Sequence, residues 1–300
     1  MNTRNTHPQR LALALALMAA AGFAQAQEAD DDGAGTSGKL LLTGGVSQVE
    51  GSAGGGLTPW AVIGGYGTRD QIGANAFYTK VNVDDYALDS YGVLVGFYDR
   101  VELSFSRQEF DTEAVGGALG LGNGFTFTQD TIGVKVKVAG DAVLEQDSWL
   151  PQIAVGAQYK KNDQPGVLAF VGARDDSGVD YYVSATKLYL AQSLLLNGTV
   201  RFTKANQFGI LGFGGDRNDD YEAQFEASAA YLLSRNLAIG AEYRTKPDNL
   251  GIATEDDAWD VFVAWAPIKN VSLTVAYVDL GNIVIRDEQR GVYASLQVGF

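Results

Sequence analysis

Histidine and cysteine, the side chains that most often serve as general base, nucleophile or soft metal ligand, are nearly missing from this chain of 300 residues. The one histidine is His7, near the N-terminus, and there is no cysteine. Catalysis that needs a histidine beside a serine or an aspartate is therefore excluded after the first residues. Carboxylates alone remain, with Glu222, Glu226 and Glu242 as candidates, but such residues serve more often as solvated charges. The sequence predicts that the protein is not an enzyme.

Metal and phosphate chemistry is equally poorly supported. The acidic run 216–220 has acids at positions one and five of a calcium loop, but Tyr221 stands where the loop needs glycine and Ala227 where it needs glutamate. The glycine-rich run 116–124 lacks the lysine of a phosphate-binding loop. We expect no catalytic, cofactor-binding or metal site, and no cofactor.

The N-terminus has the three parts of a secretory signal. Arg4 and Arg10 supply positive charge, an apolar run follows from Leu11, and Ala24-Gln25-Ala26 is a small-x-small cleavage site. We expect residues 1–26 to be a cleaved signal peptide and 27–38 to be a disordered acidic lead-in. After that cleavage 20 Lys and Arg face 36 Asp and Glu, a net charge of −16, which argues against a nucleic-acid partner.

From residue 39 onward apolar residues alternate with polar or small ones, which is the period of a β-strand. Between Tyr221 and Tyr231, for example, the odd positions are Tyr, Ala or Phe and the even ones Glu, Gln, Ser or Ala. Most segments of this kind have 10 to 13 residues, about twice a globular strand but right for a tilted membrane strand. We count fourteen segments: 39–49, 57–68, 71–83, 86–98, 100–110, 127–139, 149–161, 179–190, 194–204, 220–233, 236–245, 257–267, 270–280 and 290–300.

The gaps between the segments alternate in length. They are short after even-numbered segments, apart from 140–148, and long after odd-numbered ones, apart from 84–85. Short turns on one side and long loops on the other are typical of outer-membrane barrels. The predicted fold is all-β: a transmembrane antiparallel up-and-down β-barrel over residues 39–300, with about 14 strands in a range of 12 to 16.

The alternation also predicts which side chains face the interior of the barrel. Mixed charges there suit either a water-filled pore or salt bridges that close it. Two loops, 111–126 and 162–178, are apolar enough either to fold inward and narrow the lumen or to pack on their neighbours. The predicted lumen-lining charges are Lys135, Lys137, Lys160, Arg201, Arg244, Glu102, Glu222, Glu226 and Glu242.

The last ten residues have apolar side chains at every second position before a terminal phenylalanine, namely Val292, Ala294, Leu296, Val298 and Phe300. This ending resembles the C-terminal signature of bacterial outer-membrane proteins, which implies that the barrel-assembly machinery reads it. The segments 237–247 and 278–282 resemble a proteobacterial family of predicted barrels that is a domain of unknown function. That resemblance covers nearly the whole mature chain and implies no active site.

These features together predict a protein of the outer membrane of a Gram-negative bacterium. We expect a passive, porin-like channel for small solutes. The alternatives are a non-conducting structural or surface-binding barrel, or a carrier of apolar small molecules; the carrier ranks last because only about 12 residues, too few for a plug, precede the first predicted strand. Expected partners are outer-membrane lipid and lipopolysaccharide, bridged by divalent cations at acidic clusters that otherwise form a solvated rim: 84–85, 175–176, 219–220 and 255–257.

Overall fold

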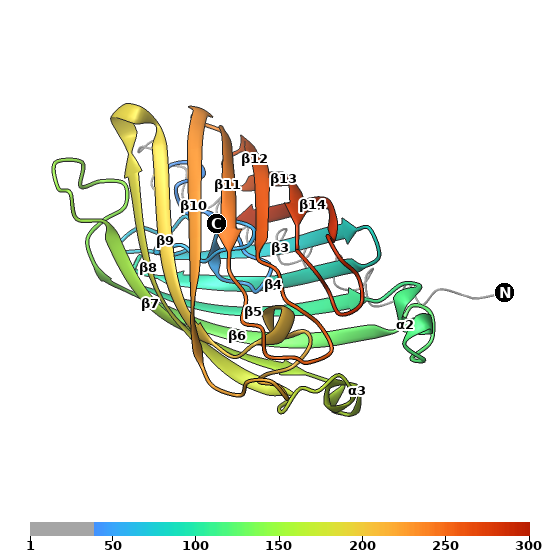
Figure 1. The fold of residues 1–300 in the computed structure, drawn as a ribbon. Helices are drawn as coiled ribbons and strands as arrows, with labels where there is room; N and C mark the ends of the chain where they lie inside the picture. Colours follow the sequence, from blue (N-terminus) through green and yellow to red (C-terminus); the bar gives the residue numbers. More distant parts are fainter. Residues whose placement is uncertain (1–38) are drawn as a thin grey trace.

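The computed structural model describes residues 39–300, so the predicted signal peptide and lead-in lie outside the described residues. Twelve long strands form one closed antiparallel barrel, in which β14 pairs with β3 to complete the ring (Figure 1). The barrel strands are β3 (Ile72–Val83), β4 (Ala87–Phe97), β5 (Val101–Asp111), β6 (Thr126–Ala139), β7 (Gln152–Asn162), β8 (Ser177–Tyr189), β9 (Leu194–Thr203), β10 (Glu222–Ser234), β11 (Leu237–Arg244), β12 (Ala258–Ile268), β13 (Val271–Asp279) and β14 (Arg290–Gly299).

The predicted fold class is confirmed, and the strand number lies at the lower end of the expected range. The loop pattern is also as expected. Connections 98–100, 190–193, 235–236 and 269–270 are short and share one end of the barrel, whereas the connections at the other end are mostly long. We call these the short-turn end and the long-loop end; in outer-membrane barrels they face the periplasm and the exterior.

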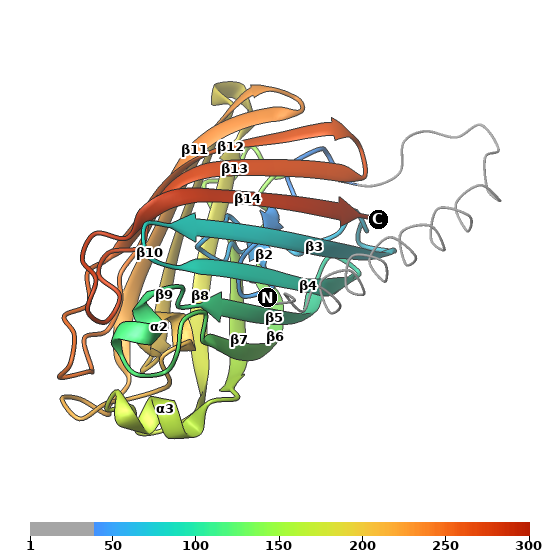
Figure 2. The same ribbon diagram turned by 90° about the vertical axis from the view of Figure 1, so that its right-hand side faces the viewer.

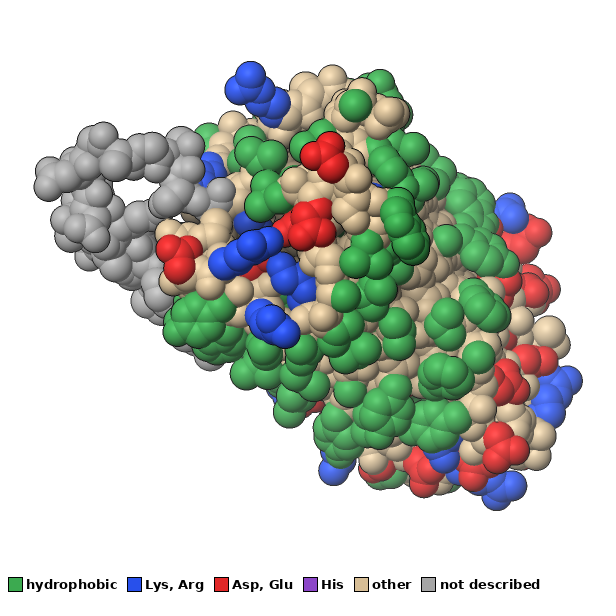
Figure 3. All heavy atoms as spheres, turned by 90° about the vertical axis from the view of Figure 1, so that its left-hand side faces the viewer, with side chains coloured by type: hydrophobic (Ala, Val, Ile, Leu, Met, Phe, Trp, Pro, Cys, Tyr) green, Lys and Arg blue, Asp and Glu red, His purple; other side chains and the backbone are tan. Residues whose placement is uncertain are grey.

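The outer wall carries the apolar half of the alternating pattern. Phe225, Val261, Val275 and Val292 are each more than half exposed. On the face shown in Figure 3, hydrophobic side chains cover the middle of the molecule and charged ones gather toward its two ends. Apolar surface of this extent on a closed barrel is the surface that lipid covers.

Two of the predicted strands are wrong. Residues 39–49 and 57–68 do not join the barrel but lie inside it, as part of a segment of residues 39–71 that we call the inner plug (Figure 2). Its only strands are the two-residue pair β1 (Val46–Ser47) and β2 (Ala53–Gly54). The physical reason is visible in the sequence, because Pro59 cannot donate to a strand ladder and the repeated glycines favour tight turns over extended strands.

The long-loop end is closed by a loop that the sequence did not single out. Residues 205–215, between β9 and β10, which we call the inward loop, are buried throughout and include the short helix η3 (Asn206–Gly209). Neither loop 111–126 nor loop 162–178 fills the lumen. Their helices α2 (Val115–Ala118) and α3 (Pro165–Phe170) lie at the long-loop rim (Figures 1 and 2). A further short helix, η2 (Leu190–Gln192), forms a turn at the opposite end.

Candidate functional site

The plugged lumen is the candidate functional site. Residues 46–65 of the inner plug are buried without a break. Near the short-turn end they are held by one charged pair of the wall, Lys135 and Glu102, whose Nζ and Oε1 atoms are 3.2 Å apart. Lys135 donates hydrogen bonds to the carbonyl oxygens of Ala53, Trp60 and Val62, at 2.8, 3.1 and 2.8 Å. Because both side chains are 1% exposed, the wall and the plug backbone satisfy each other's polar groups here.

Further up the lumen, one acidic residue of the plug meets basic residues of three different strands. The Glu50 carboxylate forms ion pairs with Lys160 of β7, with Arg244 of β11 at 2.8 Å and with Arg201 of β9 at 3.7 Å. The same three cations also contact two acidic residues of the wall. We call this set of three cations and three anions the central ion cluster; its members are Glu50, Lys160, Asp180, Arg201, Glu226 and Arg244.

The balance of charge in this cluster follows from its burial. Each of the six side chains is at most 3% exposed, and an unpaired charge at such a depth would be strongly unfavourable. Burial alone raises the pKa of the Glu50 carboxyl, but Arg244, Lys160 and Arg201 lower it by more. The net result is a pKa well below the ordinary value, so Glu50 stays ionised inside the barrel.

A third anchor lies at the turn of the plug around residues 55–58. The Glu242 carboxylate accepts hydrogen bonds from the backbone N–H of Leu57, at 2.7 Å, and from the Thr58 and Ser228 hydroxyls, at 2.6 and 2.9 Å. Asp260 stands directly opposite Glu242 on the neighbouring strand, and its Oδ1 atom has no hydrogen-bond partner among the described residues. The plug is thus fixed to β10 and β11 as well as to β5 and β6.

The inward loop meets the plug at the central ion cluster. The backbone carbonyl of Phe208 accepts hydrogen bonds from Lys160, at 3.0 Å, and Gln129, at 3.2 Å, and the Arg244 guanidinium lies 4.0 Å from the centre of the Phe208 ring. Gln207 and Phe208 both have positive φ, at 44° and 62°. Two adjacent residues in that strained region persist only where the surroundings hold them, so the loop is firmly seated.

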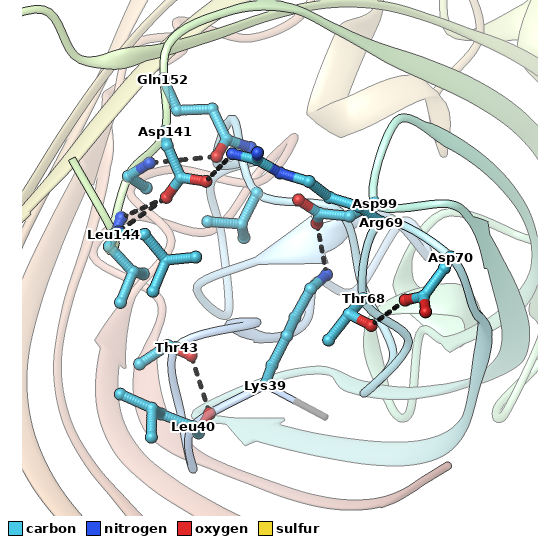
Figure 4. A pocket seen from close by; sticks show the side chains of 13 residues that line it. Lys39, Leu40, Thr43, Thr68, Arg69, Asp70, Asp99, Asp141, Leu144 and Gln152 are labelled. Atoms are coloured by element: carbon cyan, nitrogen blue, oxygen red, sulfur yellow. Dashed lines mark hydrogen bonds and ion pairs between the residues drawn. The ribbon is translucent and has the colours of Figure 1, made fainter. Parts of the chain in front are cut away.

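Two cavities border the plug at different heights of the lumen. The larger, of about 440 Å³, opens at the short-turn end and is lined by Lys39, Asp99, Arg69, Asp141 and apolar residues of the plug and of loop 140–151 (Figure 4). The smaller, of about 30 Å³, lies between the plug and the inward loop and has almost only apolar walls. The lumen therefore has a vestibule at one end, and beyond it lie the buried residues 46–65 of the plug and 205–215 of the inward loop.

Two ion pairs line the vestibule. Lys39 is 2.7 Å from Asp99, and Arg69 is 3.4 Å from Asp141 (Figure 4). Burial lowers the pKa of the Lys39 ammonium group, which Asp99 partly offsets. Burial raises the pKa of Asp141, but hydrogen bonds from the backbone N–H groups of Leu144 and Val143 lower it by more.

The structure brings most of the predicted lumen charges together. Seven of the nine belong to the anchors above: the Lys135–Glu102 pair, four members of the central ion cluster, and Glu242. Lys137 lies at the short-turn end beside Asp99, and Glu222 lies near the long-loop end, where it accepts a hydrogen bond from Asn218 at 2.6 Å. The other seven predicted side chains are buried against the plug or the inward loop: Glu102, Lys135, Lys160, Arg201, Glu226, Glu242 and Arg244.

Three important acidic residues were missed. Asp180 lies on β8 and Asp260 on β12, two strands on which no lumen charge was predicted, although the same alternation would have placed both side chains on the inward face. Glu50 had no comparable signal, because its segment was taken for a membrane strand and its loop. Among residues 39–300 no group of three or more acidic side chains is placed to hold a metal ion. No helix in this part of the chain is both long and apolar enough to cross a membrane.

Comparison with known proteins gives a family. Similar solved structures include a KdgM porin (11% identity, TM-score 0.49, covering 75% of this chain and 99% of that chain). Another is a NanC porin (10% identity, TM-score 0.48, covering 76% of this chain and 98% of that chain). A third is Omp33 of Acinetobacter baumannii (7% identity, TM-score 0.46, covering 78% of this chain and 100% of that chain). No curated protein matches the sequence.

The model of the family described as "Protein of unknown function (DUF3034)" matches residues 43–297, which is most of the chain. The resemblance to an uncharacterised family of barrels is thereby confirmed. The chain belongs to this family of unknown function, and its fold is a closed antiparallel β-barrel.

Proposed function

We propose that this protein is an outer-membrane channel for small solutes that its inner plug holds closed. The observation that carries the proposal is the position of Glu50. This residue of the plug sits between Lys160, Arg201 and Arg244, which come from three strands of the wall. The negative charge of Glu50 therefore balances the excess positive charge of these wall residues. If the plug moved out of the lumen, it would leave behind a polar, charged wall.

The composition of the lumen supports a channel more than a solid structural barrel. A barrel that needs only stability can fill its interior with side chains of its own strands. Here a segment of about thirty residues does so, and it is held mainly through hydrogen bonds and ion pairs with the wall. Mixed charges on a lumen wall suit the passage of hydrated solutes. The vestibule of about 440 Å³ would form the entrance to a solute path at the short-turn end.

Planar-bilayer recording of the refolded protein tests this proposal. Wild-type protein should be closed for most of the time. Glu50→Gln leaves three cations facing two anions, so it should loosen the plug and produce frequent openings. Glu113→Gln, an exposed substitution in the loop after β5, is the matched control and should behave as wild type. Silence of Glu50→Gln over many insertions would favour the non-conducting barrel instead.

A carrier of apolar small molecules is the second candidate, because the cavity between plug and inward loop has apolar walls; at about 30 Å³ it would have to widen by a movement of the loop to hold such a molecule. Val49, Leu57, Phe110, Leu211 and Ile283 contribute to it. The sequence ranked this function last because too few residues preceded the first predicted strand to form a plug. In the structure, residues 39–71 form one. Fluorescence titration with an apolar probe of the naphthalene class tests it: Leu57→Glu should abolish binding, and equal binding by wild type and variant would exclude this cavity as the site.

The terminal strand supports a further part of the proposal, recognition by the barrel-assembly machinery. Val292 and Leu296 are exposed on the outer wall, whereas Tyr293, Ser295 and Gln297 point inward. An alternating strand of this kind offers an apolar face and a free edge before the barrel closes. Replacement of Phe300 by Gln should lower the amount of folded barrel in the outer membrane, measured by heat-modifiable gel mobility.

A further inference from the structure

One section of the outer wall is polar where the rest of the wall is apolar. On β3 to β6, outward positions in the half nearer the long-loop end carry charged residues and tyrosines. Across the ladder, Lys80 stands opposite Asp89, which stands opposite Glu109. In the next row toward the membrane centre, Tyr91 stands opposite Arg107, which stands opposite Asp130. We call these six residues the outer-wall polar patch.

The patch residues already interact with one another. Lys80 forms an ion pair with Asp89 at 3.1 Å, and the Tyr91 hydroxyl donates to Glu109 at 2.8 Å. Arg107 makes two parallel hydrogen bonds with Asp130, at 2.6 and 2.7 Å. These contacts lower the cost of placing charges on a membrane wall but leave them partly exposed, because the Arg107 and Asp130 side chains are 43% and 38% exposed.

Outward charges near the long-loop ends of other strands, such as Lys161 on β7 and Arg290 on β14, lie only at the last one or two residues of the strand, and several other outward positions there are apolar. Phe202 on β9, Phe225 on β10 and Trp259 on β12 point outward within four residues of the long-loop ends of their strands. Figures 2 and 3 show the barrel from opposite sides. β3 to β6 form neighbouring strands in Figure 2, and the face in Figure 3 is covered mainly by hydrophobic side chains. The polar patch is therefore a local feature of one wall.

The depth of the patch makes it unlike a simple rim. On β5 the outward apolar residues are only Val101, Leu103 and Phe105, and Arg107 comes next. From Val101 to Phe105 is roughly 13 Å of strand, or about 10 Å along the membrane normal at a tilt of about 40°. The apolar band of such barrels is about 25 Å tall. On β10, by contrast, outward apolar residues run from Ala223 to Tyr231, about twice that height.

From this geometry we infer that the polar patch is covered by a second copy of this chain, so that the protein is a two-fold dimer in the membrane. A two-fold interface places the same surface on both subunits, which demands a self-complementary patch. The patch contains both cations and anions, with Arg107 directly beside Asp130, so a rotated copy can set the Arg107 of one chain against acidic residues of the other. The apolar row below, with Val93, Phe105 and Ile132 exposed, would extend the contact.

The charge of the patch favours a protein over an anionic glycolipid. Its two cations face three acidic residues, so its net charge is −1, and phosphate groups would gain no attraction from it. Lipopolysaccharide could cover the patch only through divalent cations. That alternative makes a different experimental prediction, because a chelator would remove it.

Single-cysteine cross-linking in isolated outer membranes tests the dimer. Because the natural chain has no cysteine, an introduced cysteine is the only thiol that can react. Tyr91→Cys, in the patch, should give a dimer-sized band with a flexible bismaleimide. Val261→Cys, which is outward and 53% exposed on β12, is the control and should stay monomeric. Arg107→Glu in the Tyr91→Cys background should abolish the band, with folding checked by heat-modifiable mobility.

Mass measurement of the purified protein in mild detergent completes the test. The inference predicts two chains per particle for wild type and one for Arg107→Glu. A wild-type monomer, or equal cross-linking of Tyr91→Cys and Val261→Cys, would overturn it. So would a monomer that carries lipopolysaccharide and releases it on addition of EDTA, which would assign the patch to the glycolipid.

Discussion

At the scale of single residues, Glu50 and Lys135 hold the plug in opposite ways. Glu50 brings a charge from the plug to the wall, whereas Lys135 extends from the wall to carbonyl oxygens of the plug. Both side chains are buried, so neither has water as an alternative partner. The closed state therefore depends on a small number of groups that can be changed one at a time.

Replacement of Lys135 by methionine should weaken the barrel. It leaves Glu102 buried without its cation and removes the hydrogen bonds to Ala53, Trp60 and Val62. Loss of one partner of a buried ion pair costs about 3–5 kcal/mol. The temperature at which heating converts the folded barrel to the unfolded form, seen as a change in gel mobility, should fall clearly. Lys161→Met, an exposed outward position on β7, should leave it unchanged; equal shifts would show that Lys135 does not anchor the plug.

Acid should open the channel only at low pH. An ordinary glutamate has a pKa of about 4.3. Because the neighbouring cations lower the pKa of Glu50 in the folded protein, its charge stabilises the plug fully above that value and this stabilisation is lost as pH falls through the lower folded-state pKa. Conductance recorded over a pH series should stay low at neutral pH and rise only below about pH 4. Opening near pH 6 would contradict this role of Glu50.

Individual residues also show how far the sequence alone could reach. Alternation within a strand is enough to place Lys160, Arg201 and Arg244 on the inner face, because side chains of a strand point to opposite faces in turn. It cannot show that the three cations converge, since they lie on β7, β9 and β11 and meet only through barrel closure. Their common partner, Glu50, lies outside any barrel strand and follows no such rule.

At the scale of elements, the plug and the strands differ in how they are specified. The twelve barrel strands were predictable because lipid on one side and a polar lumen on the other impose a period of two. The inner plug contacts barrel wall on all sides, so no period is imposed on it. Pro59 and the run Gly54–Gly56 were the available signals, since proline and glycine weaken a strand. The inward loop, residues 205–215, has no pattern that sets it apart from the other loops.

Gly54 tests the conformation of the plug directly. A Cβ atom there would lie 2.1 Å from the carbonyl oxygen of Thr58 and 2.9 Å from the Cα of Pro59, both backbone atoms that cannot move aside. Gly54→Ala should therefore destabilise the plug by about 1–3 kcal/mol and raise the frequency of channel openings. Gly198→Ala on the outer face of β9 meets nothing within 4 Å and is the control. Closed recordings from both variants would refute the described plug geometry.

At the scale of the whole molecule, the barrel is closed at two levels that share one cluster of charges. Lys160 contacts Glu50 of the plug and the carbonyl of Phe208 in the inward loop. A displacement of the plug should therefore disturb the inward loop, and a displacement of the loop should disturb the plug. This coupling distinguishes a gated channel from a barrel that is filled only for stability, because a solute path requires both levels to move.

A reversible disulfide between plug and wall tests the central claim most directly. The Thr58 and Ser228 hydroxyl oxygens are 2.5 Å apart, and the natural chain has no cysteine. In a Glu50→Gln background, the pair Thr58→Cys and Ser228→Cys should abolish single-channel openings when oxidised and restore them when reduced. If conductance is the same in both redox states, residues 39–71 are not the gate.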